Sequence, residues 1–217
     1  MDDADIAKAA AACVSGAFGA AGQNCIGVQR IYVHDAVFDM FRDAMVAAIG
    51  ALRVGDPMDG ETDVGPMAGA GEAERIIAWT VDAVGRGATL LVGGERAGTL
   101  VRPTLLADVP EDAKVVCHEA FGPVASLFRF TDPREAIDAA NRADYAIHAA
   151  VFTESLRMAR DVASRLRVAG VMINDSTDYR LDAMPFGGAG RGNMGREGVR
   201  FAAREMSQTK VICFHDA

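Results

Sequence analysis

Short strand-like segments alternate with segments of helical periodicity along this chain, and no other feature constrains its fold as strongly. Residues 28–33, 88–92 and 170–174 are rich in β-branched and other apolar residues, which strands prefer. Between such segments, apolar residues recur at steps of three and four, as in residues 2–17, which is the pattern of an amphipathic helix. The alternation predicts an α/β fold with a largely parallel open sheet covered by helices.

The chain shows no internal repeat and no low-complexity linker, so we expect a single domain over residues 1–217. Further helices are expected at residues 34–52, 72–84, 132–140, 155–166 and 196–206, and further strands at residues 100–106, 124–130 and 148–152. Residues 209–214 are expected to form a terminal strand.

Composition excludes several classes of protein. The formal charge of −8 argues against nucleic acid and anionic membranes as partners. No apolar run approaches the roughly 18 residues of a membrane span, and the acidic first residues differ from the basic opening of a secretory signal. The cysteines show neither CxxC spacing nor nearby paired histidines, so we expect no disulfide framework, no metal site and a reduced, cytoplasmic setting.

Cys25 lies in a glycine-flanked turn between a helical pattern and a strand pattern. Gly22 lets the backbone turn sharply, so that the turn can present a thiol and its own backbone N–H toward a cleft. A cysteine nucleophile needs both, because it attacks a carbonyl carbon and helps to hold the oxyanion that forms. The alternative is that Cys25 is a small buried hydrophobic residue, as free cysteines often are.

Gly190, Gly192 and Gly195 form a literal GxGxxG, the spacing of a dinucleotide-binding fingerprint. That fingerprint requires a preceding strand and a following βαβ unit with an acidic ribose contact. Polar residues and Pro185 precede these glycines, and only 22 residues follow Gly195. We therefore do not interpret them as a Rossmann motif.

Several motifs occur in an order that resembles the aldehyde dehydrogenase superfamily over nearly the whole chain. The segment 18–25 resembles the family's catalytic-cysteine signature, 64–66 resembles a loop midway in its catalytic domain, and 119–123 resembles its cofactor-contacting motif. Residues 170–174 and 185–188 resemble its substrate-loop and C-terminal region.

The resemblance implies an NAD- or NADP-dependent oxidation of an aldehyde to a carboxylic acid. Cys25 would add to the aldehyde as a thiolate, giving a thiohemiacetal and then a thioester that water hydrolyses. By the same resemblance, Glu119 would hydrogen-bond the nicotinamide ribose and Phe121 would lie along the nicotinamide. The alternative for Glu119 is a solvated acid at a strand end.

The loop 175–183 would supply much of the substrate pocket, with Asn174 at its mouth. A buried asparagine that bonds local backbone would give the same sequence signal. Arg180 could clamp a carboxylate or phosphate of the aldehyde. It could equally be a surface arginine paired with Asp178 or Asp182.

Compared with the family that it resembles, the chain lacks a cofactor-binding domain before the cysteine. Only 24 residues precede Cys25, and they contain none of the Rossmann-type cofactor domain that precedes the nucleophile in the family, nor its water-activating glutamate. The chain therefore resembles only the C-terminal catalytic half, and Met1 could be an internal position of a longer frame. We expect little activity from it alone, because general base catalysis contributes about 10²–10⁴-fold.

The sequence leaves the partner and the aldehyde open. The leading hypothesis is a catalytic half that works as a homo-oligomer or with a separate cofactor-binding chain. A second is a non-catalytic interaction module, whose strand at residues 209–214 joins a neighbouring sheet, as the family's terminal strand does. A third is a thiol esterase or acyl carrier that works through Cys25 without a nucleotide.

Overall fold

A four-stranded sheet forms the centre of the computed structural model, which describes residues 1–192 and 194–215. Its order is β1–β6–β5–β2, with bounds Arg30–His34, Val124–Phe130, Thr104–Ala107 and Thr89–Val92. β6 pairs in parallel with both β1 and β5, whereas the edge strand β2 is antiparallel to β5. The predicted α/β fold with a largely parallel sheet is confirmed.

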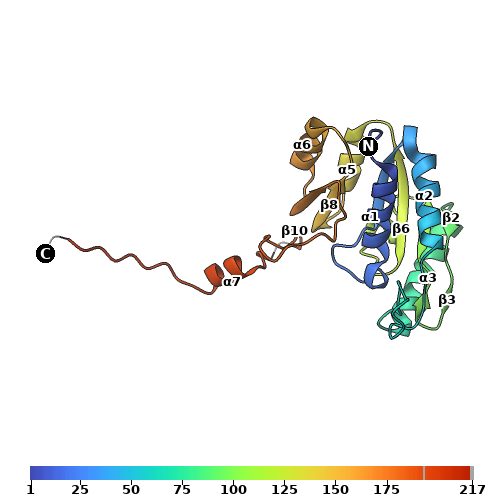
Figure 1. The fold of residues 1–217 in the computed structure, drawn as a ribbon, viewed down its shortest axis with the longest axis horizontal. Helices are drawn as coiled ribbons and strands as arrows, with labels where there is room; N and C mark the ends of the chain where they lie inside the picture. Colours follow the sequence, from blue (N-terminus) through green and yellow to red (C-terminus); the bar gives the residue numbers. More distant parts are fainter. Residues whose placement is uncertain (193, 216–217) are drawn as a thin grey trace.

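Helices cover the two faces of this sheet. The larger helices are α1 (Ile6–Phe18), α2 (Phe38–Gly50), α3 (Ala70–Gly85), α5 (Pro133–Ala140) and α6 (Leu156–Arg165). Figure 1 shows α1 and α2 side by side over the sheet. Large apolar side chains between these layers are fully buried, and each contributes roughly 1.5–3 kcal/mol. They include Phe18, Met45, Ile76, Leu105 and Leu127.

The helices α1 and α5 lie on opposite faces of β1. The Arg30 guanidinium donates to the carbonyl oxygens of Ala139 and Ala140 at the end of α5, at 3.3 and 3.4 Å. Ile31 and Val33 are buried in the same cluster as α1 and α2. Because successive side chains of a strand point to opposite faces, α5 lies across the sheet from α1.

A second, smaller sheet lies beyond β1. It consists of two parallel strands, β8 (His148–Val151) and β9 (Gly170–Ile173), joined through α6. Ile137, Val151 and Val162 form a separate small core beneath it. In Figure 1, β8 lies on the side of α1 that is away from β2.

The other elements are short. They are η1 (Gly19–Gly22), η2 (Asp35–Val37), β3 (Arg96–Ala97), β4 (Leu100–Val101), α4 (Lys114–Cys117), β7 (Tyr145–Ala146), β10 (Ala189–Gly190) and α7 (Val199–Glu205). The single strand predicted at residues 100–106 is wrong, because the chain breaks it into β4 and β5. Pro103 lies at the break and has no N–H to donate to a sheet.

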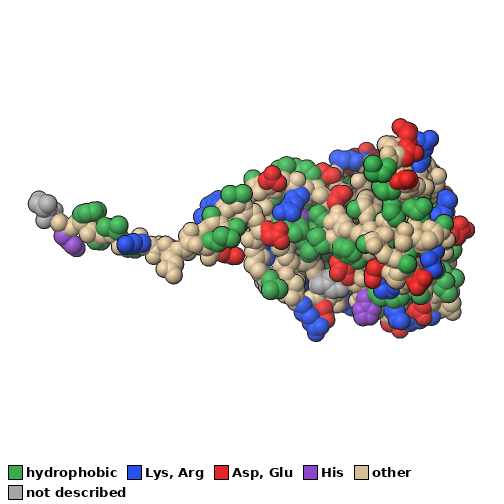
Figure 2. All heavy atoms as spheres, turned by 90° about the horizontal axis from the view of Figure 1, so that it is seen from below, with side chains coloured by type: hydrophobic (Ala, Val, Ile, Leu, Met, Phe, Trp, Pro, Cys, Tyr) green, Lys and Arg blue, Asp and Glu red, His purple; other side chains and the backbone are tan. Residues whose placement is uncertain are grey.

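The C-terminal segment projects from the body as an extended tail (Figure 1). No strand forms at residues 209–214 in the described part of the chain, so the terminal strand predicted there is absent from this single chain. A strand needs a neighbour for its backbone, and residues 209–214 form no backbone hydrogen bond to any described residue. Val211, Ile212 and Phe214 are 66–94% exposed. Figure 2 shows apolar side chains along the tail. None of the described helices has the length and apolar character that crossing a membrane requires.

Candidate active site

The Cys25 turn and the 119–123 motif meet backbone against backbone. Ala20, Ala21 and Gly22 all have positive φ, and they bring the chain from α1 into the turn. Gly22, with φ of +68°, lies so close to Gly122 that a Cβ atom at Gly22 would overlap the Gly122 carbonyl. Position 22 therefore requires glycine for two reasons, the sharp turn that the sequence predicted and the close contact with Gly122.

Two glutamines beside Cys25 fix this arrangement. The Gln23 Oε1 accepts a hydrogen bond from the Ala68 N–H at 2.8 Å, which ties the turn to the loop after residues 64–66. The Gln29 amide donates to the carbonyls of Val115 and His118, at 2.9 and 2.6 Å, and accepts from the Ala120 N–H at 3.0 Å. Gln29 therefore holds the backbone on both sides of Glu119.

Cys25 is exposed at the centre of this frame. The Asn24 Oδ1 accepts from the Ile26 N–H at 3.2 Å, and the Asn24 carbonyl accepts from the Gly27 N–H, which closes the turn around the cysteine. Within residues 1–192 and 194–215, the Cys25 N–H donates to no acceptor. The thiol and the N–H are therefore both free to meet a ligand.

Cys13 shows the opposite environment. It is buried on the inner side of α1, and burial raises the pKa of its thiol to about 12. A thiol with such a pKa is protonated at neutral pH and is a poor nucleophile. The description of free cysteine as a buried hydrophobic residue thus fits Cys13 and does not fit Cys25.

Glu119 and Phe121 line the same cavity as Cys25. Glu119 is exposed and pairs with no cation in the described part of the chain, and Phe121 is 43% exposed with φ of +46°. Arg75 fixes the backbone between them, because its guanidinium donates to the Ala120 carbonyl at 2.7 Å. The two side chains project from a rigid backbone while their own ends stay free.

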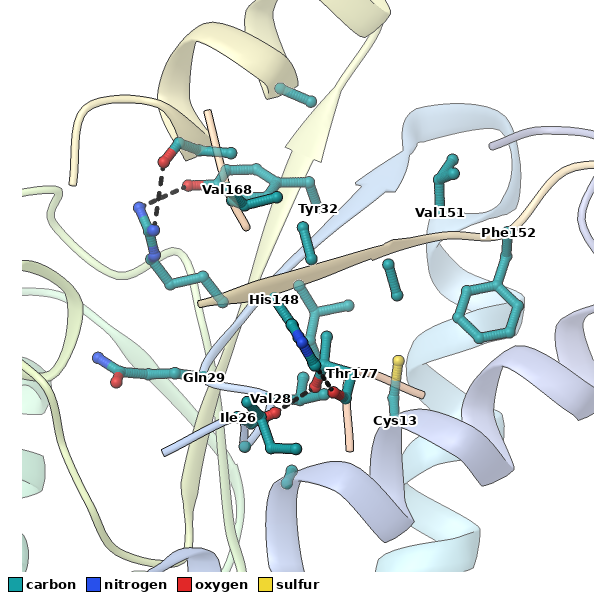
Figure 3. A pocket seen from close by; sticks show the side chains of 18 of the residues that line it. Cys13, Ile26, Val28, Gln29, Tyr32, His148, Val151, Phe152, Val168 and Thr177 are labelled. Carbon is teal, nitrogen blue, oxygen red and sulfur yellow. Dashed lines mark hydrogen bonds between the residues drawn. The ribbon is translucent and has the colours of Figure 1, made fainter. Parts of the chain in front are cut away.

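The cavity has a volume of about 290 Å³ and is lined by Cys25 and by residues of β1 and β8. Figure 3 shows Tyr32 of β1 and His148 and Val151 of β8 around it. Figure 3 shows His148 and Thr177 pointing toward each other at its wall. The His148 Nδ1 donates to the Thr177 carbonyl at 2.8 Å, and the Thr177 hydroxyl donates to the Ile26 carbonyl at 2.5 Å. The loop 175–183 is thereby tied to the residue that follows Cys25.

Asn174 lies apart from this cavity, with its side chain engaged by local backbone. Its Oδ1 accepts from the Thr153 N–H at 2.8 Å, and its Nδ2 donates to the Thr153 carbonyl at 2.9 Å. Its φ of +55° starts the loop that leads to Thr177. These contacts match the alternative in which Asn174 holds local structure.

Arg180 pairs with neither Asp178 nor Asp182 in the described structure. Its guanidinium lies 4.1 Å from the centre of the Phe186 ring and 3.7 Å from the Glu197 carboxylate, with 40% of the side chain exposed. Arg180 does not line the cavity that contains Cys25. Its present partners come from the glycine-rich loop and the approach to α7.

The glycine-rich loop around residues 187–195 folds on itself. A Cβ at Gly188 would overlap the Gly192 carbonyl, and β10 pairs antiparallel with β7. The helix α7 begins only at Val199. Asn193 lies outside the described residues. Gly188 thus serves close packing within the loop, whereas a Cβ at Gly190 would overlap the Asp144 carbonyl outside it.

Sequence reasoning missed Gln23, Gln29, Thr177 and His148. Gln29 carried a usable signal, because it places a long amide side chain in the strand-like segment 28–33. A polar group in such a place requires hydrogen-bond partners. No group of three or more metal-ligating side chains is found in the searched ranges 1–192 and 194–215.

The chain matches the family model described as "Aldehyde dehydrogenase family" over residues 1–212. It is 51% identical over 99% of its length to a putative aldehyde-dehydrogenase-like protein of Sinorhizobium fredii, and 46% identical over 99% to aspartate-semialdehyde dehydrogenase 1 of Pseudomonas canavaninivorans. It covers 42% and 46% of those two proteins, and so spans less than half of the curated relatives that it matches.

Solved structures agree with this relationship. The glyceraldehyde-3-phosphate dehydrogenase GapN of Methanocaldococcus jannaschii, complexed with NADP, matches with a TM-score of 0.91 and 40% identity, over 95% of this chain and 45% of that one. Aldehyde dehydrogenase 21 of Physcomitrella patens, in complex with the reaction product succinate, matches with a TM-score of 0.91 and 36% identity, over 96% and 43%. The chain belongs to the aldehyde dehydrogenase family.

Proposed function

We propose that residues 1–217 supply the nucleophile half of an NAD(P)-dependent aldehyde dehydrogenase. The observation that carries this proposal is the position of Cys25, whose exposed thiol and unengaged N–H open on one cavity together with Glu119 and Phe121. Membership of the family and the NADP complexes of solved relatives support it.

Cys25 acts first, as a thiolate. Its sulfur forms a bond to the aldehyde carbon, and the π-electron pair of the carbonyl moves to the oxygen, giving a thiohemiacetal oxyanion. The Cys25 N–H donates to this oxyanion as the negative charge develops. Loss of hydride from the same carbon restores the C=O bond and leaves a thioester on Cys25. Water then releases the carboxylic acid and the thiol.

Glu119 and Phe121 would hold the nicotinamide end of the cofactor. The free carboxylate can accept hydrogen bonds from ribose hydroxyls, and the exposed ring offers an apolar face to the nicotinamide. The Gln29 and Arg75 contacts fix the backbone that carries both side chains. The bound nicotinamide supplies the hydride acceptor.

Substrate class is proposed from the relatives. One is an aspartate-semialdehyde dehydrogenase, and another, from Priestia megaterium, is a 3-sulfolactaldehyde dehydrogenase at 40% identity over 97% of this chain and 44% of that protein. Both names denote aldehydes with an anionic group. Arg180 lies outside the Cys25 cavity, so it would bind such a group by giving up its 3.7 Å contact with Glu197 and turning toward the cavity, while Asn174 would support the loop that carries it. Cys25 must stay reduced for this chemistry, which suits the cytoplasm.

Protection of Cys25 from alkylation tests the proposal without requiring turnover. Succinate semialdehyde is expected to slow modification of Cys25 by iodoacetamide, because the thiohemiacetal removes the thiolate. Cys117 and Cys213, both exposed, serve as controls in the same digest and should react at an unchanged rate. Equal alkylation of Cys25 with and without the aldehyde would contradict the proposal.

A second candidate function rests on the projecting tail. Exposed Val211, Ile212 and Phe214 can add to the sheet of a neighbouring subunit, so that the chain acts as an oligomerisation module. Sedimentation of the chain and of a variant with all three residues changed to serine separates this role from catalysis. Only the oligomeric state should change, and Cys25 protection should not.

A further inference from the structure

Two consecutive hydrogen bonds connect β8 to the turn of the nucleophile. The His148 Nδ1 donates to the Thr177 carbonyl at 2.8 Å, and the Thr177 hydroxyl donates to the Ile26 carbonyl at 2.5 Å (Figure 3). A carbonyl oxygen can only accept a hydrogen bond, so Nδ1 is the ring nitrogen that carries the proton. We call this path from His148 through Thr177 to Ile26 the Thr177 link. It joins β8 and the loop 175–183 to the residue that follows Cys25.

The Thr177 link is buried where it meets the turn. Thr177 and Ile26 are each 8% exposed, and among residues 1–192 and 194–215 no other group donates to the Ile26 carbonyl. Water is a poor replacement for the hydroxyl at a buried position. Because a buried acceptor without a partner is unfavourable, the fold holds the Ile26 carbonyl in one direction.

A third hydrogen bond carries this restraint to the N–H of Cys25. The Ile26 carbonyl shares a peptide group with the Gly27 N–H, which donates to the Asn24 carbonyl at 3.0 Å. The Asn24 carbonyl in turn shares a peptide group with the Cys25 N–H. In a planar trans peptide group the C=O and the N–H point in opposite directions. The Thr177 hydroxyl thus restrains the direction of the Cys25 N–H through two peptide groups.

The His148 ring is itself held in place by its neighbours. A Cβ at Gly170 would lie 2.8 Å from the His148 Cδ2, and the Phe186 ring meets the His148 ring edge-on with the ring centres 5.7 Å apart. His148 and Gly170 are also partners in the pairing of β8 with β9. The donor at the start of the Thr177 link is therefore fixed by packing around the second sheet.

We propose that Thr177 and His148 are positioning residues for the Cys25 N–H, the donor to the thiohemiacetal oxyanion. This inference rests on the proposed function of Cys25. A donor stabilises an oxyanion most when its direction is set before the charge develops, because no reorganisation is then needed. Both residues act through the backbone of the turn. The loop 175–183 would thereby orient the oxyanion donor in addition to flanking the substrate.

Hydrogen exchange of the 217-residue chain tests the positioning without any ligand. Thr177→Val keeps the branched shape of the side chain and removes the hydroxyl, so the Gly27 amide is expected to exchange about tenfold faster. Thr177→Ser retains the hydroxyl and should keep the exchange slow. Ser176→Ala is the matched control, because the Ser176 hydroxyl is buried on the same loop and has no hydrogen-bond partner among the described residues.

Aldehyde binding tests the use of this position. Succinate semialdehyde is expected to protect Cys25 from iodoacetamide through the thiohemiacetal, and half-protection should require about tenfold more aldehyde in Thr177→Val. Thr177→Ser and Ser176→Ala should require the same concentration as the unchanged chain. Without aldehyde, the rate of Cys25 alkylation should stay within about twofold in every variant, because the thiol is not part of the Thr177 link.

Variants of His148 test the other end of the Thr177 link. His148→Ala removes the donor to the Thr177 carbonyl and should speed Gly27 exchange by about threefold, less than Thr177→Val, because the hydroxyl bond to Ile26 remains. His148→Asn keeps an N–H near the position of Nδ1 and should reverse most of this increase. If circular dichroism shows that Thr177→Val does not fold, the two His148 variants decide.

Unchanged Gly27 exchange in Thr177→Val would overturn the proposal. Equal aldehyde protection of the unchanged chain and Thr177→Val would also overturn it, and the proposed function would then still stand. A change in the rate of alkylation without aldehyde that is as large as the change in the aldehyde requirement would indicate a general loosening of the turn and would likewise count against the proposal. If aldehyde does not protect the unchanged chain, the proposed function fails, and the exchange rates still decide whether Thr177 and His148 hold the turn.

Discussion

Gly22 and Gly122 lie in backbone contact, and this contact joins the turn of the nucleophile to the motif that carries Glu119 and Phe121. The two glycines are 100 positions apart in the sequence. Because neither glycine has a side chain, no side-chain atoms lie between the two backbones at this contact. The distance between Cys25 and the Glu119 segment is therefore set by main chain alone.

Gly22→Ala is expected to destabilise the chain by about 2 kcal/mol or more, because a left-handed φ and a steric overlap both oppose a Cβ at this position. Urea unfolding measures the change. Gly71→Ala is the matched control, since Gly71 lies in α3 with open space around it, and alanine there should stabilise by up to about 1 kcal/mol. A neutral Gly22→Ala would show that the two backbones separate at little cost.

Gln29→Ala is expected to cost about 2–4 kcal/mol, since three hydrogen bonds are lost at about 1 kcal/mol each and the Ala120 N–H loses its partner. Gln29→Glu keeps the acceptor but loses both donated bonds, so it should also destabilise. Gln208→Ala, in the exposed tail, controls for loss of an amide and should be silent in urea unfolding. Equal stabilities of the Gln29 and Gln208 variants would contradict this account.

Local chemistry explains the turn, which the glycines of residues 18–25 predicted. A shared site for residues 18–25 and 119–123 was implied by the resemblance to the family, and the structure places residues of both segments along one cavity. The ion-pair partner of Arg180 was not predicted correctly. Its partner Glu197 lies 17 positions away, beyond the nearby aspartates that the sequence suggested, because the glycine-rich loop folds back.

Non-local pairing explains what sequence reasoning could not find. Residues 209–214 have strand propensity, but propensity supplies no neighbour, and the segment stays extended and exposed. The separation of β1 and β8 into two sheets was equally impossible to find in the sequence. Residues 148–152 read as a strand that would join the sheet, and nothing in the local pattern shows that β8 and β1 stay apart.

Cys13 should make stability fall in alkaline solution. Burial raises the pKa of its thiol to about 12 in the folded chain, whereas an unfolded thiol titrates near its usual value of about 8.5. Below the unfolded pKa the Cys13 thiol is protonated in both states, and its full contribution to the free energy of unfolding is present. Between the unfolded and the folded pKa, only the unfolded state loses the proton. Unfolding free energy should therefore decrease by up to about 1.4 kcal/mol per pH unit.

Urea unfolding between pH 8 and pH 11 measures this slope. Cys13→Ala should flatten it relative to the unchanged chain, even though the substitution removes some buried volume. Cys117→Ala, at an exposed position, is the control and should leave the slope as it was. A slope that persists in Cys13→Ala would assign the alkaline loss to another group.

Asp3 should make stability fall in acid through its contacts beyond β8. Partial desolvation acts against ionisation, but hydrogen bonds from the Thr153 hydroxyl and the N–H groups of Ser155 and Glu154 outweigh it and lower the pKa of Asp3. Because the pKa of Asp3 is lower in the folded chain, its ionised carboxylate stabilises the fold above the unfolded pKa of about 3.9. This stabilisation is lost as the pH falls through the folded pKa. Because Asp3 is exposed, solvent screening limits the effect to about 1 kcal/mol or less.

Asp3→Asn, compared with the exposed neighbour Asp2→Asn, tests this in urea unfolding at pH 6 and pH 3. At pH 6 only the Asp3 variant should be weaker than the unchanged chain. At pH 3 the difference should shrink, since the unchanged chain then loses most of the same contribution. Because the Asp3 contacts hold the segment that carries Met1 against Phe152, hydrogen exchange near residues 152–155 should also speed up in Asp3→Asn alone. Equal exchange in both variants would mean that the Met1 contact needs no support from Asp3.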